Sequence, residues 1–227
     1  MNGCSVREFT ENPSDGINVR GFLHIPEIST GYGLVLTHGA GANCQSQLLV
    51  AISRAFCEAG FGVLRCDLPF RQLRPHGPPV RGSAERDQLG LRRAIEALRK
   101  HVPGRVFAGG HSYGGRQATL LLTSEPGLVE GLLLLSYPLH PPKNPEQLRT
   151  EHFPRLRTPA LFVHGARDGF ATHSEISKAL KLIPAKTRLL EIENAGHELL
   201  SRKNAEELPK IIVQTSREMF GAAETGS

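Results

Sequence analysis

The chain has 227 residues, 39% of them hydrophobic and 22% charged, with a formal net charge of +5. No apolar run approaches the roughly 20 residues that cross a bilayer, which excludes a membrane-spanning protein. A positive charge would suit a polyanionic partner. Between residues 65 and 105, however, arginines mix with acidic residues and no nucleic-acid motif accompanies them, so we expect no nucleic-acid binding. The length predicts a single domain over residues 1–227.

The N-terminal segment MNGCSVREFTENPSDG lacks the basic start and apolar stretch of a secretory signal, so we expect a cytoplasmic protein. The four cysteines form no C-x-x-C pair and stand apart from any histidine cluster with the spacing of a zinc site. We therefore predict free thiols, and a buried structural role for Cys44. The cysteines are Cys4, Cys44, Cys57 and Cys66.

Apolar, β-branched runs alternate along the chain with helical patterns, which indicates strands joined by crossover helices. The predicted strands are Val19–Ile25, Gly33–Thr37, Gly62–Cys66, Arg105–Gly109, Leu128–Ser136, Ala160–His164 and Thr187–Ile192. The predicted helices are Gln47–Ala59, Ser83–Lys100, Tyr113–Ser124, His173–Leu182 and Ala205–Phe220. Several strands are continuously apolar, as in sheets covered on both faces. We predict an α/β fold with a mostly parallel sheet of about seven or eight strands flanked by helices.

Two proline-rich stretches, 67–82 and 137–159, interrupt this alternation and cannot form central strands. Each follows the C-terminal end of a predicted strand, the edge where open α/β sheets bind their ligands. We interpret them as walls of a binding site, too short for a large cap domain. Side chains that could line this site, or could equally be solvated loop residues, are Arg71, Arg74, His76, Tyr137 and His140.

A chemical motif stands where a predicted strand runs directly into a glycine-rich turn and then a helix. The segment RVFAGGHSYGGRQATLLLT places Gly-His-Ser-Tyr-Gly at this turn, with Ser112 at its centre. A G-x-S-x-G turn is too sharp for side chains at its glycine positions, and it leaves the serine hydroxyl exposed at a helix N-terminus. Ser112 is therefore the predicted nucleophile. The simpler alternative is a capping serine in a glycine-rich turn.

A serine hydroxyl needs a general base, and the base needs a carboxylate that fixes its tautomer. Among ten histidines, His197 stands in the loop ENAGHELL between the last predicted strand and the final helix. Asp168 follows the strand in PALFVHG and completes the order Ser, Asp, His known from one class of hydrolase. We predict His197 as base and Asp168 as its partner, although an Asp beside Gly169 is also a common turn.

The negative charge that develops on a carbonyl oxygen during acyl transfer needs hydrogen-bond donors. The backbone N–H of Tyr113 is the first predicted donor. The second is that of Ala40, in the turn THGAGANCQ, where Gly39 and Gly41 allow close approach. Interpreted as a nucleotide-binding loop, GAGANC lacks the Lys and Ser/Thr of a P-loop and the spacing of a dinucleotide motif.

With these residues in place, the chain resembles the α/β-hydrolase superfamily over nearly its full length. It is most similar to the hydrolase-like domains that a testis-expressed vertebrate protein and a subunit of a nuclear histone-acetyltransferase complex share with many bacterial proteins. The segments that carry this resemblance are LVLTHGAGAN, VLRCDLPF, GGHSYGGR, LLLLSYPLHPPKNPEQLRTEHFPRLRTPALFVHGARD and ENAGHEL.

The chain departs from that group at the serine turn. There the group often has Gly-Gly-Lys-Ser-Met-Gly, or Arg in place of Lys, whereas His111 and Tyr113 flank the serine here. A looser resemblance to dienelactone hydrolases exists, but those enzymes use a cysteine where Ser112 stands. The change of flanking residues predicts a different pocket shape with the same chemistry.

The resemblance implies an α/β-hydrolase fold and a serine hydrolase that acts on a small acyl substrate through an acyl-enzyme. Ester, thioester, lactone and amide substrates stay open, while haloalkane cleavage would need an aspartate nucleophile. We expect no metal and no organic cofactor, because the predicted residues supply the nucleophile, the proton transfer and the charge stabilisation. The rival hypothesis is a non-catalytic binding or scaffold protein with a hydrolase shape.

Overall fold

The computed structural model describes residues 3–14, 16–141 and 143–221. Its strands are β1 (Cys4–Glu11), β2 (Val19–Pro26), β3 (Gly33–Thr37), β4 (Gly62–Cys66), β5 (Val106–His111), β6 (Leu132–Leu135), β7 (Ala160–Gly165) and β8 (Thr187–Ile192). Its helices are α1 (Gln47–Glu58), α2 (Pro69–Leu73), α3 (Ala84–Arg99), α4 (Tyr113–Ser124), α5 (His173–Leu180) and α6 (Glu207–Phe220), with a 3₁₀ turn at Phe153–Arg155.

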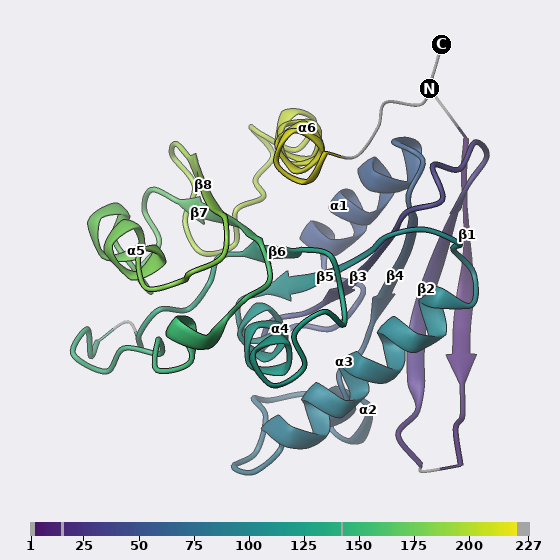
Figure 1. Ribbon diagram of the computed structural model, residues 1–227, viewed down its shortest axis with the longest axis horizontal. Helices are drawn as coiled ribbons and strands as arrows, with labels where there is room; N and C mark the ends of the chain where they lie inside the picture. Colours follow the sequence, from purple (N-terminus) through teal and green to yellow (C-terminus); the bar gives the residue numbers. More distant parts are fainter. Residues whose placement is uncertain (1–2, 15, 142, 222–227) are drawn as a thin grey trace.

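The strands form one eight-stranded sheet in the order β1-β2-β4-β3-β5-β6-β7-β8 (Figure 1). The six strands β3 to β8 are parallel to one another. Strand β2 runs antiparallel to β4, and β1 runs antiparallel to β2. Helices α1 and α6 cover one face and α3 and α4 the other. The predicted mostly parallel α/β sheet is confirmed.

All seven predicted strands are present, but the longest is shorter than expected. The expected strand Leu128–Ser136 contributes only Leu132–Leu135 to the sheet, because the chain turns at Gly127 before entering it. The inner strands β3 to β7 are buried along their whole length, as their continuous apolar sequences predict. Their side chains form two cores, one on each face of the sheet.

Strand β1 was not predicted. Its sequence CSVREFTE is largely polar, and most of its side chains are exposed because it lies at the edge of the sheet. It nevertheless pairs with β2 along its full length, from Cys4 opposite Pro26 to Glu11 opposite Val19. A search for apolar runs misses such a strand, since backbone pairing rather than side-chain burial holds it.

The prediction of four free thiols is wrong for two cysteines. Cys4 on β1 and Cys57 near the end of α1 form a disulfide between residues 53 positions apart. The sequence gives no sign of this pairing, because β1 itself was unforeseen. Cys44 and Cys66 are free and buried, and burial was predicted for Cys44.

The proline-rich stretches form no strand in their described residues, as predicted. The first contains the short helix α2 and the second the 3₁₀ turn, and neither builds a cap domain. Among the described residues, no helix combines the length and apolar character needed to cross a membrane.

The strand order reverses at β3, which lies between β4 and β5. In an open α/β sheet, the loops on either side of such a reversal separate and leave a crevice at the carboxyl ends of the strands. The loop of residues 38–44 follows β3, and the glycine-rich turn follows β5. The fold therefore brings these two predicted functional segments to the same crevice.

Candidate active site

Ser112 occupies the turn between β5 and α4 with φ 49° and ψ −111°, a conformation that non-glycine residues rarely adopt. Its N–H donates to the Leu135 carbonyl at 2.8 Å, and its carbonyl accepts from the Arg116 N–H at 3.0 Å. A Cβ at Gly110 would overlap the Thr37 carbonyl, and one at Gly114 would lie 2.5 Å from the Thr37 hydroxyl. The glycines of this turn are therefore required by the close approach of β3.

His197 links Ser112 to Asp168. Its Nε2 lies 2.8 Å from Ser112 Oγ, and its Nδ1 lies 2.9 and 3.0 Å from the two oxygens of Asp168. The Asp168 side chain is fully buried, whereas 19% of the His197 side chain is exposed. Because an ionised carboxylate only accepts hydrogen bonds, the proton of a neutral His197 lies on Nδ1. The lone pair of Nε2 then faces the serine hydroxyl.

Burial raises the pKa of Asp168, but other interactions outweigh it. Hydrogen bonding and charge interaction with His197, together with the Phe170 N–H that donates to Oδ1 at 2.8 Å, leave this pKa below its ordinary value. Asp168 is therefore ionised at neutral pH, as a partner that orients a histidine requires.

Two rings hold the imidazole of His197 in place. Phe170 stacks on it with ring centroids 4.1 Å apart, and His111 lies on it at 5.1 Å. The Nε2–H of His111 donates to the backbone carbonyl of His197 at 2.9 Å. Burial, with the nearby His197, lowers the pKa of His111, so this ring stays neutral. The residue before the serine thus ties the turn directly to the loop that carries His197.

The loop of residues 38–44 is held by a buried histidine. The Nε2 of His38 accepts from the Leu68 N–H at 3.1 Å, which places its proton on Nδ1, and Nδ1 donates to the Gly39 carbonyl at 2.9 Å. The Ala42 N–H donates to the same carbonyl at 3.1 Å. A Cβ at Gly39 would lie 3.5 Å from Ser112 Cβ, so this loop runs close beside the serine.

Arg71, at the middle of α2, joins the same loop to the first proline-rich stretch. Its buried guanidinium donates to the carbonyls of Ala40 and Ala42, each at 2.7 Å. It also donates to the carbonyls of Arg74 and Gly77, each at 2.9 Å. No carboxylate forms an ion pair with it in the part of the chain that the structure describes. Arg71 therefore holds backbone rather than lining an open pocket.

Asp87 of α3 supports the turn from behind. One of its oxygens accepts from the Tyr113 hydroxyl at 2.7 Å and the other from the Phe70 N–H at 2.9 Å. Burial raises the pKa of Asp87 above its ordinary value, against the opposite effect of these hydrogen bonds. The carboxyl connects α2, α3 and α4 at one buried point.

Of the other side chains considered as pocket lining, Arg74 and His76 are exposed. Tyr137 is buried, and its hydroxyl donates to the Arg149 carbonyl at 2.8 Å. His140 is buried and its Nδ1 donates to the Pro141 carbonyl at 2.8 Å. The Tyr137 hydroxyl and His140 Nδ1 therefore bind the second proline-rich stretch itself, whereas His140 Nε2 lies 3.5 Å from a carboxylate oxygen of Glu175 on α5.

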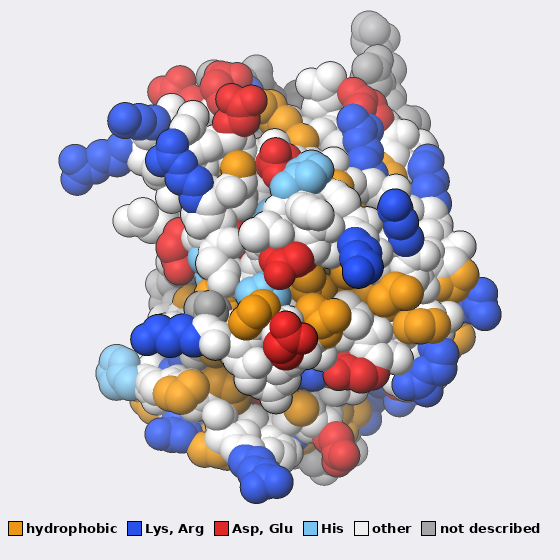
Figure 2. Space-filling view, turned by 90° about the vertical axis from the view of Figure 1, so that its left-hand side faces the viewer, with side chains coloured by type: hydrophobic (Ala, Val, Ile, Leu, Met, Phe, Trp, Pro, Cys, Tyr) orange, Lys and Arg blue, Asp and Glu red, His pale blue; other side chains and the backbone are white. Residues whose placement is uncertain are grey.

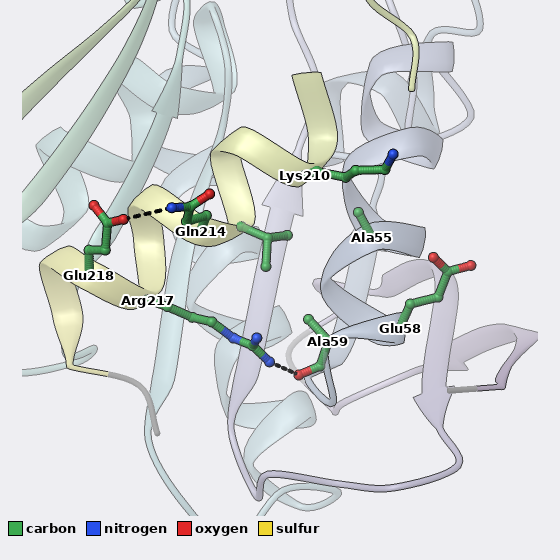
Figure 3. A pocket seen from close by; sticks show the side chains of 8 residues that line it. Ala55, Glu58, Ala59, Lys210, Gln214, Arg217 and Glu218 are labelled. Atoms are coloured by element: carbon green, nitrogen blue, oxygen red, sulfur yellow. Dashed lines mark hydrogen bonds between the residues drawn. The ribbon is translucent and has the colours of Figure 1, made fainter. Parts of the chain in front are cut away.

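The side of the molecule with α5 and the second proline-rich stretch faces the viewer in Figure 2. Histidine and hydrophobic side chains lie near its middle, and most lysines and arginines lie toward its periphery. A cavity of about 640 Å³ lies elsewhere, between α1 and α6 (Figure 3). Arg217 crosses it to donate to the Ala59 carbonyl just after α1. Because α1 runs back to the start of β4, this groove lies at the opposite edge of the sheet from Ser112.

Comparison with known proteins places the chain in a family. The model of the alpha/beta hydrolase domain family matches residues 31–223. The chain belongs to the α/β-hydrolase family. The match begins just before β3 and ends after α6, so it includes Ser112, Asp168 and His197.

Solved structures share this fold at low sequence identity. The dienelactone hydrolase from Anabaena variabilis has 20% identity and a TM-score of 0.74, with coverage of 95% of this chain and 99% of that one. Est1E from Butyrivibrio proteoclasticus has 17% identity and a TM-score of 0.73, with coverage of 94% and 99%. The Pyrococcus furiosus esterase Pf2001 has 15% identity and a TM-score of 0.74, with coverage of 96% and 92%. The α/β hydrolase described here therefore spans nearly the full length of each.

The structure brings Ser112, His197 and Asp168 into hydrogen-bond contact. Tyr113 directly follows Ser112, and Ala40 lies in the loop that runs beside it. Sequence reasoning missed the polar contacts of His38 and His111. Their positions offered a signal, because each directly adjoins a predicted functional segment.

We predict that Asp87 reduces stability as the pH rises. Its raised pKa means that the folded state holds the proton more tightly than the unfolded chain, so stability is lost between the ordinary and the raised pKa. The free energy of unfolding of wild type should therefore fall relative to that of Asp87→Asn across this interval. Urea unfolding followed by circular dichroism at several pH values measures the difference.

The matched control is Glu85→Gln, which changes an exposed acid on the same helix. A difference between wild type and Asp87→Asn that moves the opposite way with pH would show that the hydrogen bonds of Asp87, rather than its burial, dominate.

Proposed function

We propose that this α/β hydrolase is a serine hydrolase that acts on a small ester or related acyl compound. The carrying observation is the continuous contact from Asp168 through His197 to Ser112, at the carboxyl end of the sheet near the point where the strand order reverses. A nucleophile, a base with a free lone pair and a buried ionised carboxylate form the arrangement that acyl transfer requires.

In the proposed first step, His197 Nε2 takes the proton of Ser112 as Oγ attacks the substrate carbonyl. The Asp168 carboxylate stabilises the resulting imidazolium, which then gives its proton to the leaving group. In the second step, His197 takes a proton from water, and the hydroxide attacks the acyl-enzyme. Collapse of the second tetrahedral intermediate returns the proton to Ser112 Oγ and releases the acid.

The backbone N–H groups of Tyr113 and Ala40 are the proposed donors to the substrate oxygen. Tyr113 is the first residue of α4, where N–H groups have no partner within the helix. The Gly39 carbonyl is engaged by His38 and Ala42, and the N–H of Ala40 points the opposite way across that trans peptide. Both groups border Ser112, which supports their role in stabilising an oxyanion.

A non-catalytic binding or scaffold protein is the alternative function. Catalysis is favoured because Ser112 keeps a strained backbone and His197 a supported orientation, neither of which a binding surface needs. The solved esterases with this fold are consistent with an ester substrate. The closer resemblance to the testis-expressed and nuclear group, and the cytoplasmic location, stay predictions from the sequence.

We predict that a fluorophosphonate probe attaches once to wild type, on Ser112. Ser112→Ala should not react. His197→Ala should react at least about 1,000-fold more slowly than wild type, because the serine loses its base. Intact-protein mass spectrometry with peptide mapping measures both. His101→Ala, which removes an exposed histidine at the far end of α3, is the control and should react like wild type.

Hydrolysis of p-nitrophenyl acetate by the same variants extends the test to turnover. Folded wild type that neither reacts with the probe nor hydrolyses short esters would contradict the proposed mechanism and favour the binding protein.

We also predict that Arg71 contributes to transition-state stabilisation through the loop of residues 38–44. Arg71→Met should weaken inhibition by a trifluoromethyl ketone, which mimics the tetrahedral intermediate, by about tenfold, less than the loss of a donor itself. The KM for the ester should change little, because the loop contacts the oxygen only as it becomes charged. Arg74→Met removes an exposed neighbour and serves as the control. Equal losses in KM and in inhibitor affinity would contradict this role.

A further inference from the structure

A second cluster of reactive side chains lies between β1, β2 and α1. Besides the disulfide of Cys4 and Cys57, it contains His24, whose Nδ1 lies 3.9 Å from Cys4 Sγ. Cys4 and Cys57 lie at the end of the sheet where the parallel strands begin. Strand β2 runs antiparallel to β4, so its last residues lie at this end, and Cys4 pairs with Pro26 there. Helix α1 also ends there, just before β4. This cluster is therefore separate from the crevice of Ser112.

The two sulfurs have different surroundings. Cys4 is partly exposed on the edge strand, whereas Cys57 is fully buried. Cys57 also stands in the last turn of α1, where the helix dipole opposes a negative charge. A thiolate is therefore disfavoured at Cys57, and an incoming small molecule can reach only Cys4 without displacing the core.

His24 presents a hydrogen-bond donor to Cys4. The Nε–H of Arg65 donates to His24 Nε2 at 2.9 Å, so the proton of the neutral ring lies on Nδ1, toward the sulfur. Burial, and then the charge of Arg65, lower the pKa of His24 to about 4, which keeps the ring neutral. A donor backed by a cation stabilises a thiolate at Cys4.

The same tautomer argues against a metal site. The ligand atoms of Cys4, His24 and Cys57 lie within 4.8 Å of one another, which would suit a metal ion if both thiols were reduced. Nδ1 can bind a metal only without its proton, and the proton would then have to move to Nε2, where Arg65 already donates. Thiol exchange fits this arrangement better than metal binding does.

We propose that Cys4 and Cys57 form a redox-active pair that exchanges with small thiols and disulfides such as glutathione, with Cys4 as the attacking thiol. The Cys4 thiolate attacks a small disulfide, forms a mixed disulfide and releases one small thiolate. The Cys57 sulfur then attacks Cys4 Sγ, and its proton passes to the departing sulfur of the small molecule. The protein disulfide forms and a second small thiol leaves, so one small disulfide yields two thiols. Two small thiols reverse the reaction.

The assignment is tested by trapping the intermediate. Reduced Cys57→Ser, incubated with glutathione disulfide, should keep one glutathione on Cys4, whereas reduced Cys4→Ser should keep none on Cys57. Cys57→Ala replaces Cys57→Ser if the buried hydroxyl disturbs folding, which circular dichroism checks. Adding His24→Phe to Cys57→Ser should slow the reaction about threefold, because a higher thiol pKa lowers the thiolate fraction more than it raises nucleophilicity. Cys66→Ala, which removes a buried free thiol, is the control.

Wild type should shift reversibly between two and four alkylated cysteines, counted after denaturation, as the glutathione buffer becomes more reducing. The proposal is overturned if the disulfide persists in every buffer in which the protein stays folded, or if the trapped adduct is on Cys57. Stoichiometric zinc retained by the reduced protein and lost in His24→Phe would assign the cluster to a metal instead. Because these measurements count thiols, their outcome is independent of any reaction at Ser112.

Discussion

The backbone of Ser112 is the constraint on which the site depends. A non-glycine residue at φ 49° and ψ −111° is strained by about 1–3 kcal/mol. The surroundings hold it there through hydrogen bonds from its N–H to Leu135, from Gly114 to His38 and from Arg116 to its carbonyl. Leu135 lies in β6, His38 directly follows β3, and Arg116 lies in α4. The sheet core therefore supplies the rigidity that keeps the hydroxyl within reach of His197.

Two neutral, buried histidines hold the neighbouring loops in place by hydrogen bonds. His38 connects the loop after β3 to the start of α2, and His111 connects the turn to the carbonyl of His197. A charged imidazole would lose much of its solvation at either position, and burial lowers both pKa values accordingly. Among the described residues, Asp168 is the only acid in hydrogen-bond contact with His197, so the charges of the proposed reaction stay on the groups that use them.

The sequence predicted Ser112 and Asp168 as site residues because each follows a buried inner strand, and His197 because it follows the last strand of the sheet, β8. The order of these three residues along the chain then predicted that their side chains lie together. The sequence did not predict β1, because this polar strand is held by its pairing with β2. It therefore did not predict the disulfide that joins β1 to α1. It also missed the contacts of His38 and His111, since a histidine's partner depends on loop conformation that no periodicity encodes.

Arg65 contacts both of the regions for which we propose a reaction. Its Nε donates to His24 beside the disulfide, and its Nη1 donates to the carbonyl of Cys44 at the end of the loop of residues 38–44, at 2.8 Å. Arg71 holds the same loop by two other carbonyls. Two guanidinium groups thus bind this loop by its carbonyl oxygens, which turns partial negative charges toward the protein. The Gly39 carbonyl of the same loop is engaged by His38 and Ala42, so the Ala40 N–H opposite it is the group that we propose to meet the negative charge of a substrate oxygen.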